Sequence, residues 1–192
     1  MQTIVITGGT GDLGSVVVPR LLTEYRCIVP YRTAQSFEKL ARHENLIGVP
    51  RLENVSDHAP LYALVHLAGG FARGSSPDDF TKMIEINLMP AVRAVDAVRP
   101  HLVDGGRIVA LSSAVSLTKP AALAAYAASK TALNTFVETL AKELKDRSIT
   151  SNALLPDTID TDAKRRTVAE SIARLLSVEA EQLTGQLIAM TL

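Results

Sequence analysis

The sequence contains a single cysteine, no tryptophan and no surplus of charge of either sign. The lone Cys27 permits no intrachain disulfide, and its position in an apolar run predicts a buried side chain rather than a nucleophile. The 20 Lys and Arg residues balance the 20 Asp and Glu residues, so net charge provides no attraction to nucleic acid or to an anionic membrane. The 4 histidines are scattered without the spacing of metal ligands, and we expect no metal site.

Long hydrophobic runs are also missing. No apolar run approaches the ~20 residues that a membrane-spanning helix needs, and Met1 leads straight into a strand-like segment without a signal peptide. We therefore expect a cytoplasmic protein with no membrane partner. The 192 residues, 47% of them hydrophobic, predict one globular domain over residues 1–192.

The N-terminal segment runs from a strand-like sequence into a glycine turn. Residues 3–7 are mostly β-branched, residues 8–14 read Gly-Gly-Thr-Gly-Asp-Leu-Gly, and an apolar helix is expected next. In this order, glycines let the backbone approach a pyrophosphate, and the helix N-terminus offers it free N–H groups. A dinucleotide site is therefore predicted. Its expected contacts in this turn are Gly8, Thr10, Gly11, Asp12, Leu13 and Gly14.

A second group of residues suggests proton transfer. Tyr126 and Lys130 stand four residues apart, which places them on one face of a helix expected near 121–146. An ammonium beside a phenol lowers the phenol pKa, which makes the tyrosine a usable general acid or base. Ser113 ends an apolar stretch upstream, and its hydroxyl can hold a substrate carbonyl. This is chemistry for moving a proton on and off an alcohol oxygen.

With these features the chain resembles the short-chain dehydrogenase/reductase family. Five further segments match in order: residues 66–69 (His-Leu-Ala-Gly), 86–88, 107–113, 151–156 and 184–186. The resemblance implies a catalytic set of Asn87, Ser113, Tyr126 and Lys130. It also implies further cofactor contacts at Asn54, Val55, Ala68, Gly69, Tyr126, Lys130, Pro156, Thr158 and Ile159.

The alternation of strand and helix patterns predicts an α/β, doubly wound parallel sheet. The expected strands lie near 3–7, 27–31, 47–52, 62–67, 106–111, 149–155 and 186–190, and the expected helices near 13–23, 35–43, 78–100, 121–146 and 166–176. The family resemblance implies a Rossmann fold with strand order 3-2-1-4-5-6-7.

The end of the second strand indicates which dinucleotide is bound. Asp or Glu commonly binds the ribose 2′-OH of NAD at this point, but the chain reads Pro30-Tyr31-Arg32-Thr33. Arg32 favours the 2′-phosphate of NADP, whereas a solvated surface arginine is the alternative interpretation. We expect NADP(H), with NAD possible.

The resemblance also implies how these residues act. Tyr126 exchanges a proton with the substrate oxygen as hydride moves to or from the nicotinamide. Lys130 lowers the pKa of Tyr126 and holds the nicotinamide ribose, Ser113 hydrogen-bonds the substrate oxygen, and Asn87 holds a water that links Lys130 to solvent. Ser113 capping a strand end and Asn87 breaking its helix before Pro90 are the structural alternatives.

The chain departs from the family in two places where it is shorter. Five residues separate Val55 from Leu61, so the helix between strands 3 and 4 is missing or very short. Either part of one sheet face is then uncovered or a neighbouring subunit covers it, and we expect a homodimer or homotetramer through the helices near 78–100 and 121–146. After Pro156 little of the substrate-covering lid remains, and residues 155–161 resemble dihydropteridine-reductase-like members.

Three functions remain open from the sequence. The first is an NADP(H)-dependent oxidoreductase for a carbonyl, alcohol or pterin-like substrate. The second is a non-catalytic, redox-sensing NAD(P)-binding regulator. The third, a relative of the extended nucleotide-sugar epimerases, rests on the glycine spacing at positions 8, 11 and 14.

Overall fold

A computed structural model describes residues 1–192 as one seven-stranded parallel sheet. The strand order β3-β2-β1-β4-β5-β6-β7 confirms the predicted Rossmann topology. The strands are β1 (Thr3–Thr7), β2 (Arg26–Pro30), β3 (Leu46–Val49), β4 (Leu61–His66), β5 (Leu102–Leu111), β6 (Thr150–Pro156) and β7 (Leu187–Met190). β5 begins four residues before its predicted start at 106, because its first residue pairs with Leu61 ahead of a register shift in β4.

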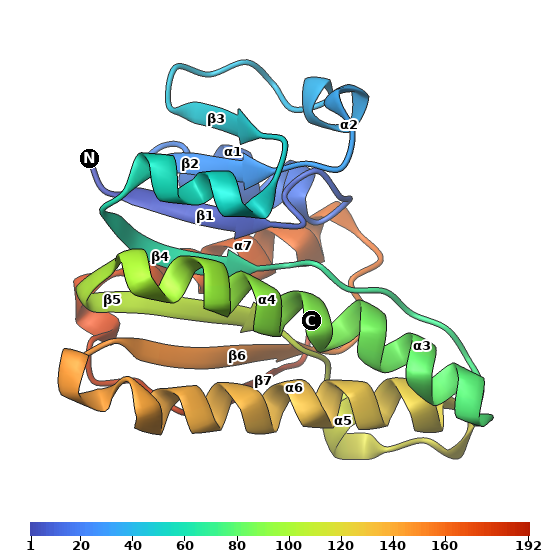
Figure 1. Cartoon of the computed structure of the whole chain (residues 1–192). Coiled ribbons are helices and arrows are strands. Elements are labelled where there is room, and N and C mark those ends of the chain that lie inside the picture. Colours follow the sequence, from blue (N-terminus) through green and yellow to red (C-terminus); the bar gives the residue numbers. More distant parts are fainter.

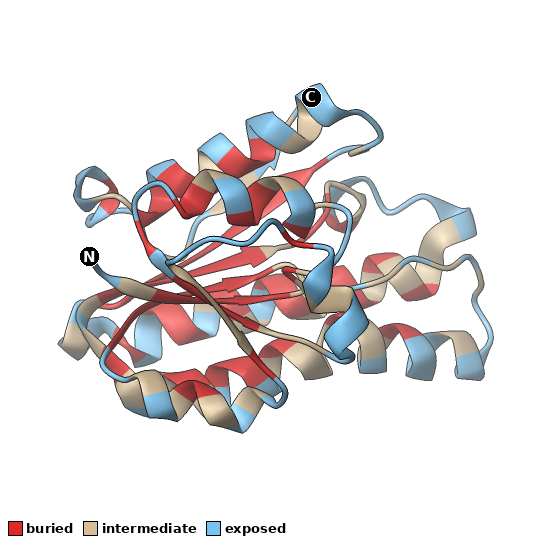
Figure 2. Ribbon diagram, turned by 90° about the horizontal axis from the view of Figure 1, so that it is seen from above, coloured by how far each residue is buried: buried red, intermediate tan, exposed pale blue.

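Helices cover both faces of this sheet. The helices α3, α4 and α6 lie in front of the sheet in Figure 1, and α1 and α7 lie behind it. The seven helices are α1 (Gly14–Leu21), α2 (Ala34–Glu38), α3 (Pro77–Asn87), α4 (Met89–Val98), α5 (Val115–Thr118), α6 (Ala124–Glu143) and α7 (Asp162–Leu176). Figure 2 shows buried residues along the sheet and on the helix faces that meet it. None of the helices combines the length and apolar character needed to cross a membrane.

The single helix predicted near 78–100 is divided into α3 and α4. Leu88 forms the junction, and Pro90 lies in the first turn of α4. Proline has no backbone N–H and its ring clashes with the preceding turn, so the helix restarts there. Asn87 therefore becomes the last residue of α3, at the edge of the sheet where the functional site is predicted.

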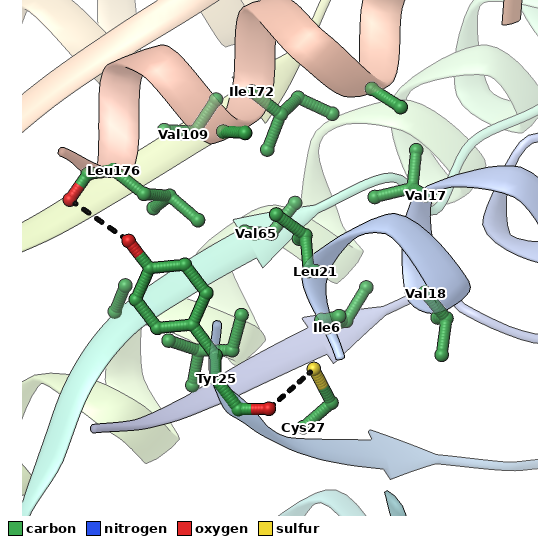
Figure 3. Close-up of a cluster of buried hydrophobic side chains, with 14 of the residues drawn as sticks. Ile6, Val17, Val18, Leu21, Tyr25, Cys27, Val65, Val109, Ile172 and Leu176 are labelled. Carbon is green, nitrogen blue, oxygen red and sulfur yellow. Dashed lines mark hydrogen bonds between the residues drawn. The ribbon is translucent and has the colours of Figure 1, made fainter. Parts of the chain in front are cut away.

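The largest core cluster lies beneath α1 and α7. Tyr25 and Tyr62 stack with ring centroids 6.1 Å apart, and both hydroxyls donate to the Leu176 carbonyl. Cys27 is fully buried in the same cluster, shown in Figure 3, and burial raises the pKa of its thiol to about 12. A thiol in that state is not a nucleophile near neutral pH, in agreement with the sequence prediction.

The short connection between β3 and β4 forms a 3₁₀ helix, Leu52–His58. Its Val55 side chain is fully buried in the cluster that also contains Ile28 of β2 and Val95 of α4. The predicted shortening is therefore confirmed. The expectation of an uncovered or subunit-covered face is wrong around Val55, because this one short helix covers the sheet there.

Val55→Ala tests how much this 3₁₀ helix contributes to stability. Removing two buried methyl groups and leaving a cavity is expected to lower the free energy of unfolding by about 2 kcal/mol. Asp57→Ala, an exposed position of the same helix, is the control and is expected to change it by less than about 0.5 kcal/mol. Urea unfolding measures both, and equal effects would contradict the anchoring role of Val55.

Candidate functional site

The glycine turn between β1 and α1 has a geometry that other residues cannot adopt without strain. Gly8 has a positive φ of 77°, and a Cβ on it would lie 2.6 Å from the Ala68 backbone nitrogen. A Cβ on Gly14 would lie 2.2 Å from the Gly9 carbonyl oxygen. No side chain caps the N-terminus of α1. The turn thus brings an uncapped helix end close to the loop that follows β4.

A cavity of about 390 Å³ opens over this turn. Nine of the predicted cofactor residues line it: Gly8, Thr10, Gly11, Asp12, Leu13, Gly14, Arg32, Ala68 and Gly69. Pro30 and Leu67 complete the lining and were not singled out in the sequence. The cavity lies at the carboxyl ends of β1, β2 and β4, where ligands bind in open α/β sheets.

Seven predicted cofactor residues lie outside this lining: Asn54, Val55, Tyr126, Lys130, Pro156, Thr158 and Ile159. Asn54 is half-buried and Val55 is fully buried in the core. Thr158 is exposed after β6, and Ile159 packs against the largest core cluster. Pro156 ends β6, and residues 157–161 alone connect it to α7, so little chain is available there to form a lid.

Arg32 is exposed at the rim of the cavity and forms no ion pair. It follows β2, whose last residue is Pro30, and no acidic side chain lines the cavity beside it except Asp12. A free guanidinium at this position presents a fork of donors that matches a phosphate.

The predicted proton-transfer residues meet at the carboxyl end of β5 and the start of α6. Tyr126 is half-buried in the first turn of α6, and Lys130 is buried one turn later. The Lys130 ammonium donates to the Leu111 carbonyl at 3.0 Å, at the end of β5. Ser113 is buried two residues beyond that strand, and its hydroxyl accepts from the Val115 backbone N–H at 3.3 Å.

The sequence predicted that Lys130 lowers the pKa of Tyr126, and the structure differs on this point. Burial raises the pKa of Tyr126, and a hydrogen bond with the Ser113 side chain opposes that rise. The Lys130 ammonium is hydrogen-bonded to a carbonyl, with no hydrogen bond to the phenol. Burial lowers the pKa of Lys130 to about 8. In this state Ser113, rather than Lys130, favours ionisation of the phenol.

Asn87 joins the two halves of the site. Its side-chain oxygen accepts from the Gly70 backbone N–H at 3.0 Å, and its amide donates to the Ser129 hydroxyl at 3.2 Å. A Cβ on the neighbouring Gly69 would lie 2.8 Å from the Asn87 oxygen and 3.3 Å from the Lys130 ammonium. Gly69 therefore belongs both to the glycine-lined cavity and to the proton-transfer group.

Two residues of the site were not predicted in any functional role. His66 ends β4 with 2% exposure, and its Nδ1 lies 2.7 Å from the Thr7 hydroxyl, whereas its Nε2 has no hydrogen-bond partner. Burial, assisted by the charge of Lys130, lowers the pKa of His66 to about 4. Phe71 places its ring edge-on to the Tyr126 ring. The signal for His66 was its place in the His-Leu-Ala-Gly segment, and no sequence signal marked Phe71.

The family of the chain follows from comparison with known proteins. The family model described as short chain dehydrogenase matches residues 52–171. The chain belongs to the short-chain dehydrogenase family. This family membership confirms the resemblance derived from the motifs, and the protein is accordingly placed among oxidoreductases.

The similar proteins differ in the share of their own length that aligns with the chain. The Escherichia coli cyclic-di-GMP-binding biofilm dispersal mediator protein is 31% identical over 179 residues, which cover 84% of the chain and 75% of that protein. Versicolorin reductase 1 of Aspergillus parasiticus is 29% identical over 134 residues, 69% of the chain and 47% of that protein. The crystal structure of BdcA in complex with NADPH has a TM-score of 0.87 and 26% identity, covering 99% of the chain and 93% of BdcA.

The lowered pKa of His66 predicts a pH-dependent stability. The pKa moves from 6.5 in the unfolded chain to about 4 in the folded one, so the unfolded chain binds more protons between these values. The free energy of unfolding should therefore be highest above pH 6.5 and fall by up to about 3 kcal/mol towards pH 4. Denaturant unfolding at a series of pH values measures this loss.

The variant His66→Gln should lose much of the slope in that pH range. His43→Gln, which replaces an exposed histidine, is the matched control and should keep it. If wild type and His66→Gln show the same slope, the titration of His66 is not its source.

Proposed function

We propose that the protein is an NADP(H)-dependent oxidoreductase that moves a hydride between the nicotinamide and a carbonyl or alcohol. The observation that carries this proposal is the position of Gly69. It lines the glycine-rich cavity and also approaches Asn87 and Lys130 of the proton-transfer group. A dinucleotide held in the cavity would thus end beside Tyr126.

The residues present fit such a cofactor. The glycine turn and the uncapped end of α1 supply backbone N–H donors for a pyrophosphate, and Arg32 supplies a cation at the rim. When bound, the reduced nicotinamide supplies a hydride to the carbonyl carbon of the substrate. Gly8, Gly14 and Ala68 keep the floor of the cavity closely packed beneath it.

The proton-transfer group supplies the second half of the reaction. Tyr126 donates its phenolic proton to the carbonyl oxygen, and the reverse transfer accompanies oxidation of an alcohol. Ser113 positions that oxygen by a hydrogen bond and stabilises the phenolate. With a pKa of about 8, Lys130 is mainly protonated at pH 7 and supplies a cation near Gly69, where the cofactor cavity meets the proton-transfer group. Asn87 fixes the loop at Gly70 relative to Ser129 of α6.

NADP is the proposed cofactor because the chain lacks an acid at the end of β2 and carries Arg32 there. The NADPH bound by the structurally similar BdcA supports this choice. NAD is the alternative cofactor. Association of copies through α3, α4 and α6, and a cytoplasmic location, remain proposals from the sequence.

A dinucleotide-binding regulator without turnover is the second candidate. The short connection at residues 157–161 favours it, because the site is covered by little chain. The name of the Escherichia coli relative also points to a regulatory role for that protein. Saturating NADPH with a panel of aldehydes and ketones separates the two candidates, since the regulator binds the cofactor without consuming it.

Tyr126→Phe tests the proposed general acid. The variant keeps the ring that packs against Phe71 and loses the proton, so kcat should fall at least about 100-fold. Affinity for NADPH, measured by cofactor fluorescence, should stay within about twofold of the wild type. Unchanged turnover with retained binding would refute the role of Tyr126.

Arg32→Ala tests the choice of cofactor. Loss of a charge-assisted contact to the 2′-phosphate should raise the Kd for NADPH about 10-fold and leave that for NADH nearly unchanged. Arg42→Ala, an exposed arginine beyond α2 that does not line the cavity, is the control. Equal weakening of NADPH and NADH by Arg32→Ala would show that the side chain does not read the phosphate.

A further inference from the structure

Phe71 is an apolar side chain in an exposed position beside the proposed general acid. Its side chain is 59% exposed although the ring contacts Tyr126, with centroids 5.1 Å apart and the ring planes at 82°. This edge-to-face arrangement is a favoured one for aromatic pairs. The remaining exposed surface of the ring has no partner in the core clusters.

The loop that carries Phe71 is held in place on both sides. The preceding Gly70 donates its N–H to the fully buried Asn87 side chain, and a Cβ on Gly70 would lie 2.9 Å from Ile86. The Gly74 carbonyl accepts from the Ala125 N–H at the start of α6. The ring is therefore presented by a fixed backbone rather than by a free loop.

Little chain is available to cover the site beside the ring. Residues 157–161, where a lid would begin, form a short connection. A substrate that reaches Tyr126 thus meets the exposed part of the Phe71 ring without an enclosing lid, and this favours a flat apolar body over a polar chain.

We propose that Phe71 selects substrates in which the reacting carbonyl is attached to a planar aromatic ring. The inference rests on the proposed function and adds the substrate class to it. An aryl ring beside the exposed part of Phe71 gains aromatic contact that a saturated ring of the same size does not. Because Tyr126 lies against the other part of Phe71, the same contact places an aryl carbonyl near the phenol.

The test compares benzaldehyde with cyclohexanecarbaldehyde, which have the same number of carbon atoms and differ in the planarity and π system of the ring. The measured quantity is the ratio of kcat/KM for the aryl substrate to that for the saturated one, with saturating NADPH. Phe71→Ala and Phe71→Leu should lower this ratio about 2- to 10-fold, and Phe71→Tyr should retain it. Phe80→Ala, an exposed phenylalanine on α3, should leave it unchanged.

A binding measurement keeps the inference separate from the proposed function. Calorimetry of the NADPH-loaded protein with benzyl alcohol and with cyclohexylmethanol reports recognition without turnover. If the wild type consumes no NADPH, the proposed function fails, and weaker binding of benzyl alcohol to Phe71→Ala still supports the role of Phe71. An unchanged aryl-to-saturated ratio for Phe71→Ala, in turnover or in binding, overturns the inference.

Discussion

The hydrogen bonds of the Asn87 side chain connect the loop after β4 to the helix that carries Tyr126 and Lys130. One amide group, fully buried, fixes the loop after β4 through Gly70 and the start of α6 through Ser129, whose hydroxyl in turn donates to the Tyr126 carbonyl. A buried amide with both ends satisfied is a strong positional constraint, because leaving either end unpaired is costly. The division of α3 from α4 at Leu88 matters for this reason. It ends a helix where its last side chain faces the site.

Burial acts in the same direction on three titratable side chains of the site, with different results for their charge near neutral pH. Burial disfavours the charged forms of His66, Lys130 and Tyr126, so all three are driven towards neutrality. His66 becomes neutral under ordinary conditions and accepts or donates at Thr7 without competing for charge. The pKa of Lys130 is lowered only to about 8, so Lys130 keeps its proton at pH 7 and donates to the Leu111 carbonyl. The site thus holds one cation, on Lys130, rather than two.

The sequence predicted correctly those structural elements that depend on residues close together along the chain. The strand at residues 3–7, the glycine turn and the one-turn spacing of Tyr126 and Lys130 depend on neighbouring residues, and the structure places the turn and the pair on the elements predicted. The contact of Phe71 with Tyr126 and the burial of His66 depend on segments brought together by the sheet. The pattern of hydrophobic residues along the chain does not indicate contacts between such distant segments. A very short helix was predicted between strands 3 and 4, but the burial of its Val55 side chain against the sheet depends on packing with β2 and α4, which the local sequence does not show.

The two shortened connections have different physical consequences. Between β3 and β4 a 3₁₀ helix replaces a longer helix, and its Val55 side chain is fully buried against the sheet. Between β6 and α7 no comparable side chain turns back over Tyr126, and Ile159 packs into the core on the other side of the sheet. Asn87, Ser113 and Lys130 are already buried by the protein, so only the half-buried Tyr126 depends on a bound molecule for shielding from water. Under the proposed function, a bound substrate would supply apolar cover for Tyr126, and the exposed ring of Phe71, which contacts Tyr126, would be the surface that receives it.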